Sequence, residues 1–108
     1  MQPVALLIAH RTQPGQRDAV RAVWQQHMPP AVVDNPGHLA YHYCFDTSDQ
    51  DVIHAFQQYR SADDAAAFLQ TSAYQAYQRD VTPLLAGPPV ITQLTPIWTK
   101  TVTDAAPQ

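Results

Sequence analysis

Residues 38–59 read HLAYHYCFDTSDQDVIHAFQQY, and they contain two strand patterns on either side of a polar segment. Within residues 38–45, aromatic or apolar side chains alternate with histidine and small residues, which is the period of a half-buried strand. The polar residues 46–51 are typical of a turn, and residues 52–59 indicate a second strand. The stretch therefore predicts a β-hairpin.

Strand parity assigns the side chains of this hairpin to two faces. One face is expected to carry Leu39, Tyr41, Tyr43 and Phe45. The opposite face is expected to carry His38, Ala40, His42, Cys44, His54 and Phe56. This second set is too apolar to remain exposed to water, so we expect another layer of protein to cover it.

The segment before the hairpin predicts a strand and a helix. Residues 3–12 alternate loosely and lead to Pro14-Gly15, which is a turn signal. Residues 16–34 carry apolar side chains at spacings of three and four, as an amphipathic helix does. Pro29-Pro30 is expected to kink or split this helix, and Asn35-Pro36-Gly37 to stop it.

Two short helices are expected after the hairpin. Ser61 with Asp64 resembles a capping box and predicts a helix over residues 62–70. Ser72 is expected to cap a second helical segment that ends near Val81.

A last strand over residues 90–98 follows the break at Gly87-Pro88-Pro89. The order strand, helix, strand, strand, helix, strand predicts an α+β, ferredoxin-like split β-α-β fold. In that fold a four-stranded antiparallel sheet has its helices on one face. Residues 1–100 are expected to form this domain, and residues 101–108 a disordered tail.

Composition limits the partners and the compartment. The chain has 108 residues, of which 45% are hydrophobic and 14% charged, so we expect a second copy to cover part of its surface. Its six Lys and Arg residues are scattered and its formal charge is -3, which argues against nucleic acid or a membrane surface. The single cysteine, Cys44, and the short apolar run over residues 4–9 predict a cytoplasmic protein without a signal peptide.

The order of these turn and core signals resembles the antibiotic biosynthesis monooxygenase family. The resemblance is carried by Asn35-Pro36-Gly37 with Leu39 and Tyr41, the helix entry after Tyr59, the aromatic pair Tyr74 and Tyr77, and the segment Pro83-Leu84-Leu85-Ala86-Gly87-Pro88-Pro89. It implies that two sheets close against each other as a dimeric α+β barrel. It also implies oxidation of phenols or quinols, which several members carry out with no cofactor.

An aromatic pocket between the helices and the sheet is the candidate site. It is expected to contain Ile8, His10, Trp24, Tyr59, Phe68 and Tyr74. In the functional interpretation, His10 is the base, Tyr59 holds a ring oxygen, and the other four bind a flat aromatic molecule. In the structural interpretation, the same aromatic residues are simply core side chains.

Several positions of this sequence differ from residues that are common in the family, and these differences limit the reactions that the resemblance implies. Gln57 and Tyr59 stand where an acidic residue and a tryptophan are common, and Phe68 stands where a histidine is common. The resemblance aligns Ile8 with an asparagine of haem-degrading relatives and Ala73 with their iron-binding histidine, so haem degradation is not expected.

A metal site is the weaker alternative. If His42 lay opposite His54, with Cys44 on the same face, the three side chains could hold Zn²⁺ or Cu²⁺. No close His-x-x-x-His or Cys-x-x-Cys element supports this, and another register would break the pairing. We therefore expect no metal, and histidines that face a partner subunit.

Two functions remain open. The first is a cofactor-independent monooxygenase that oxidises a phenolic, quinol or polyketide-type aromatic molecule, which His10 and Tyr59 favour. The second is a non-catalytic dimer that binds a small ligand or responds to stress, which the departures at Gln57, Phe68 and Ala73 favour.

Overall fold

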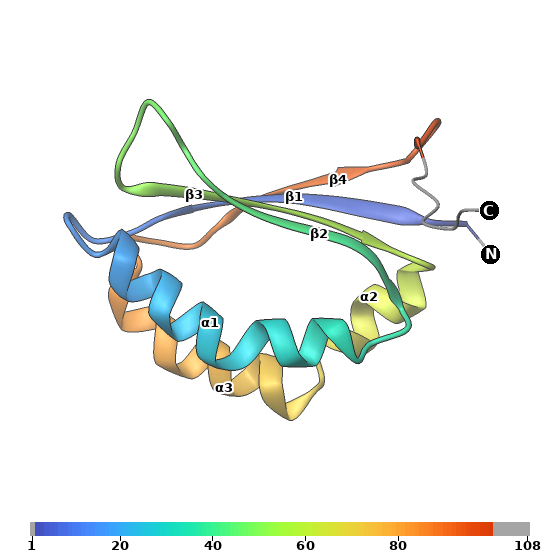
Figure 1. The fold of residues 1–108 in the computed structure, drawn as a ribbon, viewed down its shortest axis with the longest axis horizontal. Helices are drawn as coiled ribbons and strands as arrows, with labels where there is room; N and C mark the ends of the chain where they lie inside the picture. Colours follow the sequence, from blue (N-terminus) through green and yellow to red (C-terminus); the bar gives the residue numbers. More distant parts are fainter. Residues whose placement is uncertain (1, 101–108) are drawn as a thin grey trace, which may run out of the picture.

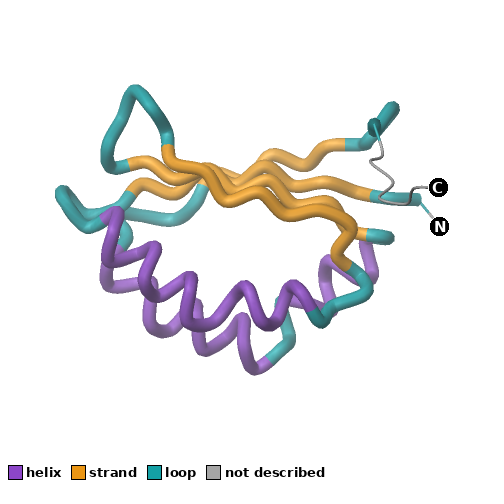
Figure 2. The backbone as a smooth tube through the Cα atoms, viewed as in Figure 1, coloured by secondary structure: helices purple, strands orange, loops and turns teal. Residues whose placement is uncertain are grey.

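The computed structural model describes residues 2–100, which form one antiparallel sheet with the helices gathered on one face (Figure 1 and Figure 2). The strands are β1 (Val4–Arg11), β2 (His38–Phe45), β3 (Val52–Tyr59) and β4 (Val90–Leu94), and the helices are α1 (Arg17–Val33), α2 (Ala62–Phe68), α3 (Ser72–Val81) and the 3-10 turn η1 (Thr82–Leu84). The strand order β2-β3-β1-β4 confirms the ferredoxin-like α+β prediction. The expected tail, residues 101–108, lies outside the described residues.

Helix α1 runs without interruption through Pro29 and Pro30, so the predicted split is absent. Each proline lacks an N–H group, which leaves a carbonyl one turn earlier without its usual helical partner. Burial offsets this loss, because Val20 and Met28 of α1 are 0% and 2% exposed and α1 packs against α3.

The caps of the two short helices are side-chain oxygens. Ser61 Oγ accepts the N–H of Asp64 at 3.1 Å, which confirms the predicted start of α2. The cap of α3 is Thr71, not Ser72, because Thr71 Oγ1 accepts the N–H of Tyr74 at 3.2 Å.

Two elements are shorter than predicted. Helix α2 ends at Phe68, and strand β4 ends at Leu94. Leu94 pairs with Ala5, which is already near the beginning of β1, so the residues beyond Leu94 have no strand to pair with. Ile97 and Trp98 are consequently 90% and 81% exposed.

The core lies between the sheet and the helices. Its buried cluster consists of Val20, Met28, Ile53, Tyr59, Phe68, Tyr77 and Val81. Strand β3 supplies a fully buried stripe, because Ile53, Ala55, Gln57 and Tyr59 alternate along one face of a strand inside the sheet. Gln57 is thus a polar residue in the middle of the packed face.

Strand β2 has one irregularity, between His38 and Ala40. An extra residue at this point shifts the alternation, so the residues before it change face. His38 therefore faces the helices, where its ring lies 4.3 Å from that of Tyr59, and Leu39 is 52% exposed. The predicted faces of His38 and Leu39 were both wrong for this reason.

Gly37 is buried where the turn before β2 passes the first turn of α2. A Cβ atom on Gly37 would lie 2.9 Å from Cβ of Asp64, which is too close for an unstrained contact. The Gly37 carbonyl also accepts the N–H of Arg60 at 2.8 Å. The turn and the start of α2 therefore form one packed unit.

Within residues 2–100, all the helices lie on one face of the sheet, and no helix covers the other face (Figure 1). It carries apolar residues that are still well exposed, among them Leu7 at 38%, Leu94 at 39% and Val90 at 68%. The structure thus confirms the predicted open face. Within the same residues no helix has the length and apolar character needed to cross a bilayer.

Arg17, at the start of α1, organises the hairpin loop between β2 and β3. Its Nη1 donates to the carbonyls of Asp46 and Asp49, both at 3.0 Å, and of Val52 at 3.2 Å. Its guanidinium carbon also lies 4.1 Å from the centre of the Phe45 ring.

Arg17→Met should lower the free energy of unfolding by about 1–3 kcal/mol, because the three carbonyls lose a shared donor. Urea unfolding is the measurement. Arg21→Met is the matched control, since Arg21 is an exposed residue on the same helix and lies farther from Phe45, at 5.8 Å. Equal losses in the two variants would contradict the role given to Arg17.

Candidate active site

A small cavity of about 50 Å³ lies between the sheet and helices α1 and α3. It is lined by Ile8, His10, Met28, Tyr41, Tyr43, Ala55, Gln57, Tyr74, Tyr77, Gln78, Pro89 and Ile91. This volume has room for one or two water molecules, whereas pockets for ring-sized ligands usually measure about 300–1,000 Å³. The cavity therefore fits a polar end group better than a whole ring.

Three of the six residues proposed from the sequence, Ile8, His10 and Tyr74, line this cavity. The other three contact residues that line it. Trp24 stacks on Tyr43 with ring centres 4.0 Å apart, the Phe68 ring centre lies 5.8 Å from that of Tyr74, and the Tyr59 hydroxyl is hydrogen-bonded to Gln57. 

Tyr59 and Trp24 use their polar atoms inside the protein. The Tyr59 hydroxyl donates to Oε1 of Gln57 at 2.7 Å, and Trp24 Nε1 donates to the Tyr41 hydroxyl at 3.0 Å. Tyr59 is therefore placed to orient Gln57, and it does not reach the cavity as a donor for a ring oxygen.

His10 has an unusual ring nitrogen. Its Nδ1 is buried and has no hydrogen-bond partner among the described residues. Burial lowers the pKa of His10 below its ordinary value of 6.5, so the ring is neutral at pH 7. A neutral histidine facing a cavity has the form that accepts a proton.

The tyrosines around the cavity remain protonated. Burial raises the pKa of Tyr41 to about 12 and also raises the pKa of Tyr43. The Tyr43 hydroxyl, like His10 Nδ1, is buried without a partner in the part of the chain that the structure describes. Such groups are rare in folded proteins, and a bound molecule or water would satisfy them.

The site predicted from the sequence did not include His38 or Gln57, which were named only as a residue of the opposite sheet face and as a departure from the family. His38 Nδ1 lies 2.9 Å from Asn35 Nδ2, and His38 Nε2 lies 3.1 Å from Gln57 Oε1. Gln57 shares a strand face with Tyr59, so parity could have revealed it. His38 gave no such signal, because its position depends on the irregularity in β2.

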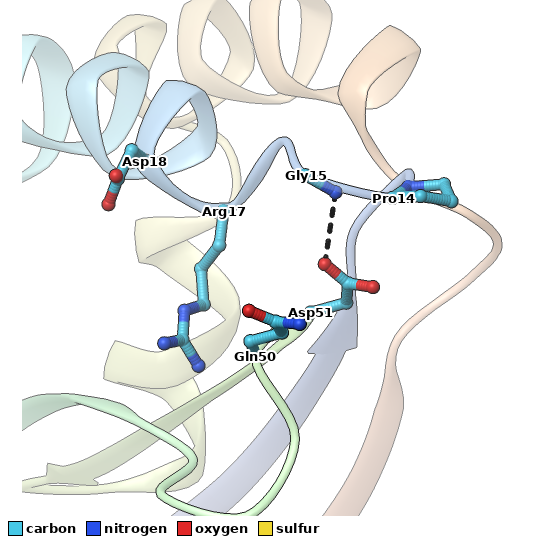
Figure 3. A pocket seen from close by; sticks show the side chains of 6 residues that line it. All are labelled: Pro14, Gly15, Arg17, Asp18, Gln50 and Asp51. Carbon is cyan, nitrogen blue, oxygen red and sulfur yellow. Dashed lines mark hydrogen bonds between the residues drawn. The ribbon is translucent and has the colours of Figure 1, made fainter.

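Another hollow, of about 360 Å³, lies at the opposite end of α1 beside Pro14, Gly15, Arg17, Asp18, Gln50 and Asp51 (Figure 3). Gly15 has a φ of 77°, which favours glycine, and its N–H donates to Asp51 Oδ1 at 3.1 Å. Arg17 is hydrogen-bonded to the backbone carbonyls of the loop between β2 and β3. These groups hold the turn and the loop together, so we assign the hollow a structural role.

The metal site considered above needs His42 opposite His54, and the strand register differs from this. Cys44 lies opposite His54, whereas His42 lies opposite Phe56. His54 Nε2 instead lies 2.7 Å from Asp46 Oδ2. Residues 2–100 contain no group of three side chains placed to hold a metal ion.

The stability of the fold should fall as the pH drops below about 6.5, because burial lowers the pKa of both His10 and His38. Unfolded histidines then take up protons before the folded ones do, so stability rises with pH in this window. Urea unfolding at about pH 7.5 and about pH 5.5 is the measurement. His38→Gln should reduce the difference, because it removes one of the two imidazoles whose pKa burial lowers.

Comparisons with known proteins agree with this fold. Residues 3–80 match the family model described as antibiotic biosynthesis monooxygenase. A "putative antibiotic biosynthesis monooxygenase" from Chloroflexus aurantiacus is 25% identical, with 94% of this chain and 99% of that one covered and a TM-score of 0.80. No curated protein matches the chain.

Two further structures support the fold alone, because their sequences are more distant. One from Caulobacter crescentus is 21% identical, covers 90% of this chain and 92% of its own, and has a TM-score of 0.84. Another from Nitrosomonas europaea is 14% identical, covers 93% and 95%, and has a TM-score of 0.85.

Proposed function

Because the chain belongs to the antibiotic biosynthesis monooxygenase family, we propose that it oxidises a phenolic, quinol or polyketide-type aromatic molecule with O₂ and without a cofactor. The observation that carries this proposal is His10, a neutral base whose Nδ1 has no partner among the described residues and which lines the cavity. Removing the phenolic proton is the first step of this chemistry, and it needs a base.

In the proposed reaction, His10 takes the proton of a naphthol-type hydroxyl group. The phenolate transfers one electron to O₂, and the resulting phenoxyl radical and superoxide combine to form a carbon–oxygen bond. Loss of water from the protonated hydroperoxide leaves a quinone, so one oxygen atom enters the product and the other leaves as water. The substrate supplies all the electrons, and the protein orients it and excludes water.

The size of the cavity defines how such a substrate would bind. Its hydroxyl end fits beside His10 and Tyr43, whereas its ring needs more room than about 50 Å³. The exposed lining residues Gln78, Pro89 and Ile91 mark the mouth, and Ile91 is 54% exposed. We place the ring at this mouth, between α3 and β4.

A homodimer is part of the same proposal. A second copy would cover the open sheet face, on which Leu7, Phe56 and Leu94 are partly exposed. A stable pair would bury more than about 1,000 Å². We keep the cytoplasm as the proposed location.

The chain should speed O₂ consumption by 1-naphthol after treatment with a chelator. His10→Ala should lower the rate by roughly 100-fold, the scale for loss of a general base. Tyr59→Phe should cost less, because it removes one hydrogen bond to Gln57. Since the pKa of His10 is lowered, the rate should rise with pH through an inflection below 6.5 and then level off.

The alternative function, a non-catalytic ligand-binding dimer, is favoured by the departures from the family at Gln57, Phe68 and Ala73. Quenching of Trp24 fluorescence reports binding and is best measured with Trp98→Phe, because Trp98 is a second, exposed fluorophore. If naphthols and hydroquinones quench Trp24 while O₂ uptake never exceeds that of buffer, the monooxygenase proposal is wrong and the alternative holds.

Phe56→Asp should separate the dimer into monomers, because a charge on the open face would be buried without a partner. Sedimentation at low micromolar concentration is the measurement. Gln25→Asp on the exposed side of α1 adds the same charge and should leave the dimer intact. Sedimentation of the wild-type chain as a 12.0 kDa monomer would contradict the dimer proposal.

A further inference from the structure

The direction of one hydrogen-bond chain is fixed by a backbone group. The N–H of Gly37 donates to Asn35 Oδ1 at 3.2 Å. A backbone N–H can only donate, so this side-chain atom of Asn35 is the carbonyl oxygen. The other terminal atom, which lies 2.9 Å from His38 Nδ1, is therefore the amide nitrogen.

The tautomer of His38 follows from this orientation. The Asn35 amide nitrogen donates, so His38 Nδ1 must accept and carries no proton. The proton of the neutral ring is then on Nε2, which donates to the nearest atom of Gln57 at 3.1 Å. Burial lowers the pKa of His38, which agrees with a neutral ring.

Gln57 consequently has one orientation. Its Oε1 accepts from His38 Nε2 and also from the Tyr59 hydroxyl at 2.7 Å, so both lone pairs are used. Its Nε2 makes no hydrogen bond with any residue that the structure describes. Gln57 lines the cavity, so this amide nitrogen is the group left for a ligand.

We propose that Gln57 presents a fixed N–H donor to the cavity and that the site therefore selects molecules entering with an anionic or carbonyl oxygen, above all a phenolate. Tyr43 contributes a second donor, because its buried hydroxyl has no partner within residues 2–100. The proton that a phenol gives up passes to His10. His38 and Asn35 are positioning residues, since they act through Gln57. That the ligand is an aromatic molecule rests on the proposed function. That the site presents donors to an acceptor oxygen rests on the hydrogen bonds described above.

The test uses 4-nitrophenol, whose ionised form is coloured, and 4-nitroanisole, which has the same ring but cannot ionise. Wild-type protein should bind nitrophenol as the phenolate at a pH below the pKa of the free compound. It should bind nitroanisole more weakly by roughly tenfold or more, the scale of one charge-assisted hydrogen bond. Nitrophenol bound in its neutral form, or equal binding of the two compounds, would overturn the proposal without any variant.

Gln57→Glu is the sharpest variant. One carboxylate oxygen can still accept from His38 and Tyr59, while the second replaces the donor with an acceptor. Above the pKa of the new carboxyl, nitrophenolate affinity should fall by roughly tenfold to 100-fold, with little change for nitroanisole. Gln75→Glu makes the same chemical change on the exposed side of α3 and should bind both compounds as the wild type does. Unchanged nitrophenolate binding by Gln57→Glu would contradict the inference.

The positioning role of His38 has its own readout. His38→Phe should reduce the phenolate absorbance of bound nitrophenol, because Gln57 can then turn, and His38→Gln should restore it by returning a donor. A loss that His38→Gln does not restore contradicts the positioning role. Nitrophenol binding needs no turnover, so absent O₂ uptake with intact phenolate binding overturns only the proposed reaction. O₂ uptake without phenolate selection overturns only this inference.

Discussion

The irregularity in β2 between His38 and Ala40 governs the polar interior of this protein. It brings an imidazole into the space between the sheet and the helices, where both ring nitrogens need partners to offset the cost of burial. Asn35 supplies one partner from the preceding turn and Gln57 supplies the other from β3. The local shape of one strand thus determines which polar atoms remain for the cavity.

Polar groups in this protein fall into two kinds. Arg17 and Asp46 lie at the hairpin loop, and their hydrogen bonds are satisfied within the fold. His10 and Tyr43 each keep a buried atom without a partner among the described residues, at a cost of about 1–3 kcal/mol each. Such a cost, concentrated in one cavity, is typical of a binding or catalytic site.

The strands and the helices could be predicted because alternation and capping are visible in the sequence, as in residues 38–59 and at Ser61. The order of these elements along the chain then indicated the fold. Parity along β1 likewise places Ile8 and His10 on one face. His38 could not be found in this way, because a bulge depends on how a turn meets its neighbouring strand. Gln57 could have been found, since parity alone puts this amide on the same buried face as Tyr59.

The close approach of Gly37 to Asp64 links the hydrogen bonds of Asn35 and His38 to the first turn of α2. Asn35 and His38 flank Gly37, so a side chain at residue 37 would push the turn away from α2 and disturb the donor that sets the imidazole tautomer. The cap of α2 and the position of the proton on the His38 ring would then change together. Glycine at this position therefore preserves both the packing of α2 and the hydrogen bonds that fix the proton of the His38 ring.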